Sequence, residues 1–366
     1  MTRARPRSAT ARAVVLATLA GSARALASTL APARAGAQIV LADDVTQGDG
    51  VRGHLEASFL NEFDTQTRGG DEWNAWRVGL DGGVEGAVDE GIRVGLRAAY
   101  QHADYAFHFD HAVRPADYGG RELPRAPWGG VNTIDLAPTA TAAFGERFAA
   151  ELAVPIRWSG ETGARRNAFA AGVTGLARVR ILDGLSLGAG AGITSQLEGP
   201  AQIFPVVALD WRILPGLALR TQGSFVQGGR AMLLWGASDA VRLVLSAAYE
   251  RNRFRLDDNG IADDRHGIGE VEAVPVEIGF RIGLFERGYL DFRAGFGFAG
   301  SLRVENANGR RLYADRYDPA PRLGLALSIP LGGARQRAAD ASASGAATYD
   351  DVPPSVIDPD APPARP

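Results

Sequence analysis

Arginine and carboxylate side chains recur at every second residue along several stretches of the chain, which places them on one face of an extended segment. The strongest candidates for chemistry on this face are Arg93, Arg97, Glu151, Arg157, Arg178, Arg220, Glu277, Arg281, Asp291 and Arg293. If this face lines a water-filled passage, its excess of arginine favours anions. The alternative is a closed interior in which arginine and carboxylate pair across neighbouring strands, because buried charges need partners.

A second candidate site is the acidic segment 257–264. Asp257, Asn259 and Asp263 supply oxygen ligands around a glycine turn, and oxygen is the ligand that Ca²⁺ prefers. The spacing matches a calcium loop only in part, since no glutamate stands where the bidentate ligand is usual. The alternative is an acidic hairpin tip formed on the Asn-Gly pair. Beyond this Ca²⁺ site, the sequence predicts no cofactor.

Catalytic chemistry has little support. His54 and Ser58, four residues apart, share one face of an extended segment, and no other serine–histidine pair stands out. The chain has no cysteine, which excludes disulfides and thiolate metal sites. We therefore expect no enzymatic activity.

Strands must position these side chains, and residues 274–284 show the strand period clearly. Even positions carry valine, isoleucine, phenylalanine or leucine, whereas odd positions carry proline, glycine or a charged residue; residues 290–298 and 323–331 repeat the alternation. One apolar face and one polar face are typical of a strand between lipid and a polar lumen. On this assignment we expect Gly279 to accept serine, because its face already carries polar groups.

Residues 51–331 are predicted to contain about fourteen such strands, within a range of twelve to fourteen. Tight turns alternate with longer links, which fall at 64–72, 106–130, 160–166, 196–201, 253–270 and 303–319. This alternation is typical of outer-membrane barrels, whose short turns lie in the periplasm. The predicted fold is all-β: an antiparallel up-and-down transmembrane β-barrel, surrounded by lipid in a bacterial outer membrane.

The segments outside the barrel differ in composition. Residues 1–37 combine a basic start, a short apolar run and small-residue cleavage sites after Ala27 and Ala37, which predicts a signal peptide. Residues 38–50 would form a short periplasmic segment, and residues 332–366 a disordered periplasmic tail. Removing residues 1–37 leaves 33 of the 39 arginines against 42 acidic residues, a net charge of −9 that disfavours a nucleic-acid partner.

The last strand contains a pattern of a polar residue, a glycine and then alternating apolar residues. Arg322, Gly324, Leu327 and Ile329 form this pattern, which resembles the β-signal that barrel proteins present to the barrel-assembly machinery, although the usual closing aromatic is absent. This resemblance implies the assembly machinery as a partner.

Three further stretches, 249–258, 267–270 and 317–321, resemble an uncharacterised family of bacterial outer-membrane barrels. That resemblance implies a fold and a location, and it brings no catalytic residues. The sequence thus favours a passive pore or transport channel with an arginine-rich lumen. The alternatives are a closed barrel that is structural or presents its loops for binding and, with less support, a lipid-modifying barrel enzyme.

Overall fold

The computed structural model describes residues 51–108, 127–164, 167–224, 228–236, 240–258, 265–284 and 288–332. The predicted signal peptide, the predicted segment 38–50 and the predicted tail beyond Gly332 lie outside the described residues. No helix among the described residues is long and apolar enough to cross a membrane.

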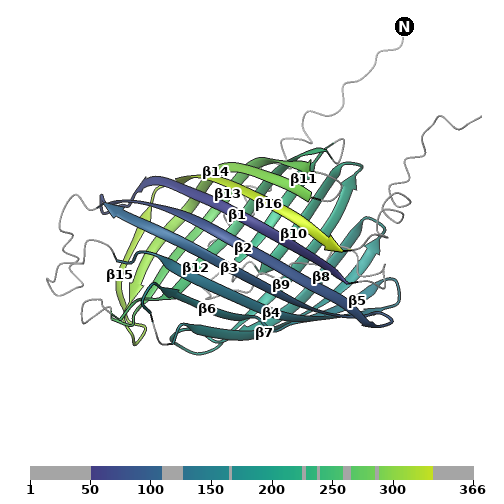
Figure 1. Cartoon of the computed structure of the whole chain (residues 1–366), viewed down its shortest axis with the longest axis horizontal. Helices are drawn as coiled ribbons and strands as arrows, with labels where there is room; N and C mark the ends of the chain where they lie inside the picture. The colour runs from purple at the N-terminus through teal and green to yellow at the C-terminus, as the bar shows by residue number, and fades with distance from the viewer. Residues whose placement is uncertain are drawn as a thin grey trace, which may run out of the picture.

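The described residues form one sheet of sixteen β elements (Figure 1). They are β1 (Arg52–Gln66), β2 (Glu72–Asp89), β3 (Ile92–His108), β4 (Val131–Phe144), β5 (Phe148–Ala153), β6 (Ile156–Glu161), β7 (Phe169–Leu182), β8 (Leu185–Thr194), β9 (Gln202–Leu214), β10 (Leu217–Ser224), β11 (Gly228–Trp235), β12 (Val241–Arg255), β13 (Ile268–Leu284), β14 (Gly288–Glu305), β15 (Arg311–Tyr317) and β16 (Ala320–Gly332).

These sixteen elements fill fourteen positions in the wall, because two positions each hold two consecutive elements. β5 and β6 both pair with β4 and β7, and a break at Val154 and Pro155 separates them. β15 and β16 both pair with β14, and the break between them contains Pro319. Proline has no N–H to donate to a ladder, so each break falls where the sequence removes a donor. The predicted barrel of about fourteen strands is confirmed.

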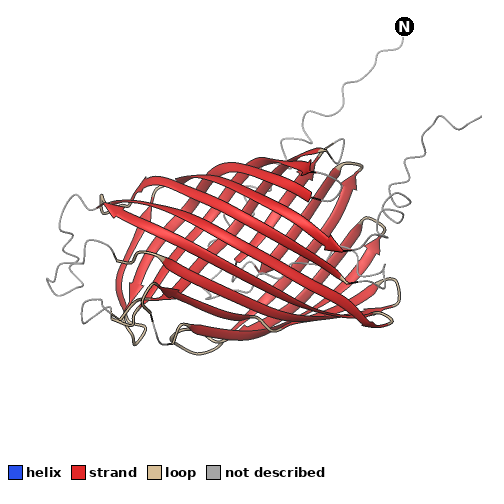
Figure 2. Ribbon diagram, viewed as in Figure 1, coloured by secondary structure: helices blue, strands red, loops and turns tan. Residues whose placement is uncertain are grey.

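The wall closes where the first strand meets the last. β1 pairs antiparallel with β16 from Arg52 opposite Gly332 to Glu62 opposite Arg322. The other wall neighbours follow chain order in antiparallel pairs, as an up-and-down barrel requires (Figure 2). Both ends of the barrel segment therefore lie with the tight turns.

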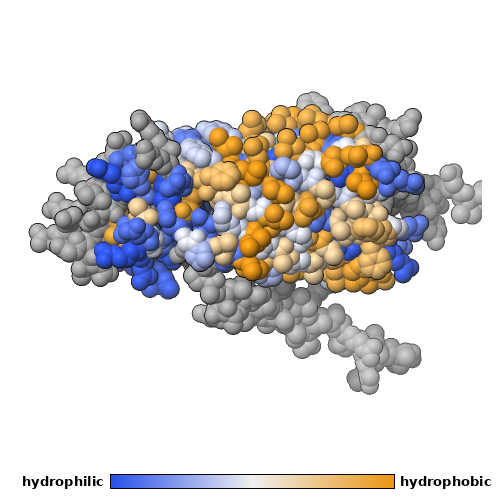
Figure 3. Space-filling model, turned by 90° about the horizontal axis from the view of Figure 1, so that it is seen from below, coloured by the Kyte–Doolittle hydropathy of each residue, from blue (hydrophilic) through white to orange (hydrophobic). Residues whose placement is uncertain are grey.

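The outer surface carries an apolar belt. Along β13, the side chains of Ile278 and Phe280 are 55% and 51% exposed, and Phe292 on β14 is also exposed. Figure 3 shows the apolar surface over the part of the barrel nearer the tight turns and a hydrophilic surface at the end near β15. Exposed apolar side chains on this scale indicate contact with lipid.

The strands extend further at the long-link end than the sequence predicts. β12 and β13 enter the link expected at 253–270, and β15 lies wholly within the link expected at 303–319. These ends contain many polar residues and so lack the alternation of lipid-facing strands. Buried ion pairs and packed aromatic rings order these strand ends instead.

Candidate functional site: the barrel interior

Ion pairs occupy the inner face of the wall. Arg157 donates two hydrogen bonds to Asp135, at 2.6 and 2.8 Å, and Arg281 donates two to Asp291, at 2.8 and 2.9 Å. Paired N–H donors of arginine fit the two carboxylate oxygens, so these bonds fix geometry as well as charge. Arg281 also lies 4.0 Å above the ring of Tyr289.

The ten residues that the sequence singles out for the lumen all lie in such ion pairs. The remaining pairs are Arg93–Glu85 (3.5 Å), Arg97–Asp81 (2.8 Å), Arg178–Glu151 (3.0 Å), Arg220–Asp210 (3.6 Å), Arg293–Asp291 (3.5 Å) and Arg293–Glu277 (3.9 Å). Their arginines therefore meet carboxylates on the same or a neighbouring strand, the arrangement expected of a closed interior.

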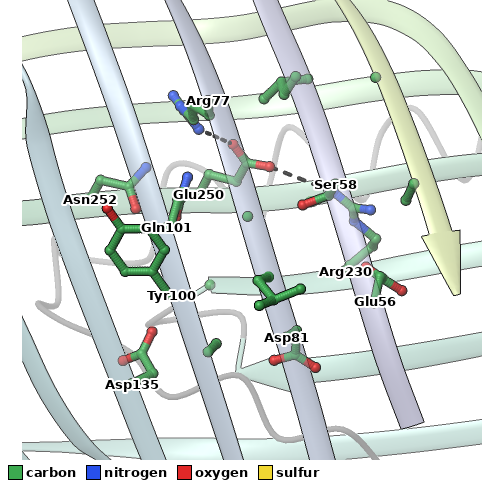
Figure 4. Close-up of a pocket in the computed structure, with 18 of the residues that line it drawn as sticks. Glu56, Ser58, Arg77, Asp81, Tyr100, Gln101, Asp135, Arg230, Glu250 and Asn252 are labelled. Atoms are coloured by element: carbon green, nitrogen blue, oxygen red, sulfur yellow. Dashed lines mark hydrogen bonds and ion pairs between the residues drawn. The ribbon is translucent and has the colours of Figure 1, made fainter. Parts of the chain in front are cut away.

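A second set of charges crosses the lumen. Glu250 on β12 accepts hydrogen bonds from Arg77 on β2 at 3.3 Å and from Arg322 on β16 at 2.8 Å, and it lies 3.6 Å from Arg230 on β11. Four wall positions separate β2 from β12, so the contact between Arg77 and Glu250 is not between neighbours. Figure 4 shows the side chains of Arg77 on β2 and Arg230 on β11 pointing toward Glu250.

Glu62 on β1 completes this layer. Its carboxylate pairs with Arg77 and lies 3.4 Å from Arg322. We call Glu62, Arg77, Arg230, Glu250 and Arg322 the crossing layer. Glu62, Arg77 and Arg322 are almost fully buried.

An aromatic cluster lies next to the crossing layer, on its long-link side. Trp73, Tyr105, Trp128, Phe254 and Tyr317 are each no more than 5% exposed. Trp128 and Phe254 pack edge to face with 5.3 Å between ring centroids, and Tyr105 of β3 stacks on Phe254 of β12 at 6.3 Å. These rings connect β3 with β12, which are not neighbours in the wall, and place apolar groups in the lumen.

The end of β12 narrows the barrel at the same level. Arg255 forms a parallel bridge with Gly160 of β6, although β7 to β11 separate these strands in the wall order. The guanidinium of Arg255 donates to the carbonyls of Asn167 and Leu197 at 3.0 and 3.1 Å and to Glu198 at 2.7 Å. The end of β12 is thus hydrogen-bonded to the connections that precede β7 and β9.

Buried charges also join β12, β13 and β14 at the long-link end. Glu270 accepts hydrogen bonds from Arg251 at 2.7 Å, Arg253 at 3.1 Å and Arg303 at 2.7 Å. Burial alone would raise the pKa of Glu270, but these three arginines outweigh it and hold the pKa below its ordinary value. These residues extend beyond the apolar belt of β13.

A cavity of about 330 Å³ lies within the barrel beside the crossing layer. Seven arginines and five carboxylates line it, and four of them belong to the ten predicted lumen residues: Arg97, Arg157, Glu277 and Arg293. The excess of arginine gives the cavity a positive charge.

The other candidate residues lie apart from this cavity or only partly in it. The backbone N–H of Asp257 donates to Glu161 at 3.1 Å, whereas Asn259 and Asp263 lie outside the described residues. Leu327 and Ile329 of the predicted assembly signal are 38% and 42% exposed on the apolar belt. Arg322 and Gly324, from the same predicted signal, line the cavity.

None of the five members of the crossing layer is among the ten predicted lumen residues, and Arg322 was predicted only as part of the assembly signal. A signal for Glu250 was present, because it continues the alternation of Ser246 and Ala248 along the inner face of β12. Its position inside a charged run, 250–258, hid that period.

A closed antiparallel wall with an apolar exterior and paired charges inside defines the class of this protein. The chain is an outer-membrane β-barrel, as its sequence predicts.

No family model and no curated protein match the chain. Among solved structures, it is similar to an outer-membrane channel from Pseudomonas putida F1, with 9% identity over 80% of this chain and 100% of that chain, at a TM-score of 0.43. It is also similar to the P. putida toluene transporter TodX, with 10% identity over 78% of this chain and 91% of that chain, at a TM-score of 0.38. A third is the translocator domain of the autotransporter NalP from Neisseria meningitidis, with 11% identity over 78% and 90% of the two chains, at 0.36.

Proposed function

We propose that this barrel is a transport channel whose resting state is closed by the crossing layer and the aromatic cluster. The observation that carries the proposal is the charged cavity beside ion pairs that span the lumen. A permanently closed barrel gains little from buried ion pairs, since apolar residues of similar volume often stabilise a core as well or better. Ion pairs can instead break and exchange partners when a solute arrives.

The solute class follows from the cavity lining. Because arginines outnumber carboxylates there, the open state should favour small anions over cations. The second candidate function is a closed structural or loop-presenting barrel, and the aromatic cluster favours it because apolar rings fill the lumen.

Single-channel recording in planar bilayers tests the choice. Glu250→Gln removes the charge that Arg77, Arg230 and Arg322 share, so these arginines should repel and the open probability should rise by an order of magnitude or more over wild type. Under a salt gradient, the reversal potential should show anion preference.

Glu151→Gln is the matched control, because Glu151 on β5 pairs with Arg178 on the neighbouring strand β7 and this ion pair does not cross the lumen. Its open probability should stay close to that of wild type. If the folded Glu250→Gln barrel is as silent as wild type at every voltage, the channel proposal fails and the closed barrel stands.

For export and assembly, we propose that residues 1–37 direct secretion and that the last strand is read by the barrel-assembly machinery. Leu327→Ser should slow insertion by reconstituted machinery while leaving unaided folding in detergent unchanged. Leu325→Ser is the control, because Leu325 faces the same lipid but occupies a position where the resembled pattern accepts any residue. Equal insertion rates for both variants would argue against the signal.

A further inference from the structure

Glu56 is a carboxylate of the inner wall that no arginine binds directly. It lies on β1, is half-buried, and lines the cavity of about 330 Å³. Within the part of the chain that the structure describes, its side chain takes part in no hydrogen bond and no ion pair. The other carboxylates that line the cavity each pair with at least one arginine: Asp81, Asp135, Glu250 and Glu277. A partly buried charge without a partner is costly, so Glu56 requires an explanation.

The charges that face Glu56 leave its surroundings negative. We call this group the acidic end; it consists of Glu56, Asp81, Arg97, Arg281 and Asp291. Asp81 stands opposite Glu56 in the β1–β2 ladder, and Arg97 donates to Asp81 at 2.8 Å. Arg281 donates two hydrogen bonds to Asp291, at 2.8 and 2.9 Å. With the nearby His54 counted as neutral, three carboxylates against two arginines give the acidic end a net charge of −1.

The crossing layer has the opposite charge, because its three arginines and two glutamates give a net charge of +1. Within it, Arg230 has uncommitted donors. Its guanidinium lies 3.6 Å from Glu250 and 3.9 Å from Glu277, and it donates no hydrogen bond to any residue that the structure describes. The side chain lines the cavity and is 19% exposed. Since paired N–H donors of arginine bind carboxylates, Arg230 can hold an anionic group there.

A neutral polar row separates the acidic end from the crossing layer. Ser58 on β1 stands opposite Gly79 on β2, which stands opposite Gln101 on β3, and along β1 and β2 this row lies between the two charged groups. Within the described ranges, no hydrogen bond holds the side chain of Ser58 or Gln101, and Ser58 is exposed although it faces inward. Glycine keeps the row open, because a Cβ at Gly79 would lie 2.7 Å from the hydroxyl oxygen of Ser58. The row therefore offers a solute neutral hydrogen-bonding groups.

We propose that the cavity binds a zwitterionic solute, with its ammonium group against Glu56 and its carboxylate against Arg230. Both residues and the neutral row line one cavity, whose volume falls within the range of small-molecule sites, roughly 300–1,000 Å³ (Figure 4). The inference rests on the proposed channel function and deepens it. The arginine excess attracts the anionic group, and Glu56 selects the anions that also carry an ammonium group, because such a group supplies the partner that Glu56 lacks.

The test compares amino carboxylates with unsubstituted carboxylates of the same chain length. The pairs of probes are glycine with acetate, β-alanine with propionate and γ-aminobutyrate with butyrate, so that the spacing between the two charges varies. Isothermal titration calorimetry measures their binding to the folded barrel in detergent at low ionic strength. At least one amino carboxylate should bind about tenfold more tightly than its unsubstituted partner, because its ammonium group gains an ion pair with Glu56.

Substitutions tell which side chains bind the two groups. Glu56→Gln should abolish the preference for the amino carboxylate while binding the unsubstituted carboxylate at least as tightly as wild type does. Arg230→Gln should weaken the binding of both probes. Glu85→Gln is the matched control and should keep the preference, because Glu85 lies beside Arg52 and Arg93 and outside the lining of the cavity. Migration on unheated gels shows whether each variant is folded.

Two results would overturn the proposal. One is the absence of any preference for an amino carboxylate in the wild-type barrel, a comparison that needs no variant to fold. The other is a preference that survives in folded Glu56→Gln. Calorimetry measures binding without conductance, so the two proposals fail separately: a barrel that shows the preference but never conducts rejects the channel and keeps the site, and a conducting barrel without the preference rejects the site and keeps the channel.

Discussion

At the scale of single residues, depth in the membrane decides the cost of a charge. Ile278 lies on the apolar belt of β13, and Ile278→Arg should lower the free energy of unfolding by roughly 2–4 kcal/mol, because the charge would sit in hydrocarbon. Equilibrium unfolding from lipid vesicles measures this change. Val88→Arg is the control, since Val88 is exposed beside a tight turn at the edge of the belt; equal costs at both positions would contradict the membrane placement.

Gly279 corrects an expectation drawn from the sequence. A Cβ at this position would lie 2.0 Å from the carbonyl oxygen of Phe292 and 2.9 Å from the Cα of Arg293. Serine is therefore not accommodated without moving the backbone, although its polarity suits the inner face. Close approach of neighbouring strands, and not polarity, requires glycine here.

At the scale of elements, the long-link ends of β12, β13 and β14 depend on the charge of Glu270. Because the pKa of folded Glu270 is lowered from its ordinary value of 4.5, its contribution to stability is complete above that value and is lost as the pH falls through the lowered pKa. Below about pH 4, the backbone amides of residues 268–272 should therefore exchange hydrogen faster, after correction for intrinsic rates.

Exchange at residues 276–282, within the belt, provides the internal control and should change less. The variant Glu270→Gln should exchange quickly at neutral pH and respond little to acid. An acid response in the variant as large as that of wild type would assign the effect to another group.

At the scale of the whole molecule, the barrel predicts which side of the wall each residue meets. Cysteines placed singly from 274 to 284 should react with a lipid-phase reagent at even positions and not at odd ones, because side chains alternate along a strand. The absence of native cysteine keeps the background clean. A water-soluble reagent is the complementary probe, and protection of every position from the lipid-phase reagent would exclude a membrane barrel.

The sequence by itself determined the strand period, the number of strands and the lipid-facing residues. Alternation is a local property: Ile278 and Phe280 point outward because they lie two residues apart, whatever the rest of the chain does. Pairing of Arg157 with Asp135 was open to the same reasoning, since their strands neighbour each other in chain order. The closed barrel follows because a strand edge in lipid has no water to satisfy its backbone N–H and C=O groups, so every edge must pair with another strand.

Only the tertiary structure decided what happens inside the wall. Arg77 meets Glu250, and β12 bridges β6, through contacts between strands that are not neighbours, and no period in the sequence encodes such distances. Whether a charged lumen is open or closed depends on contacts between residues far apart in the chain, such as the bridge between β12 and β6.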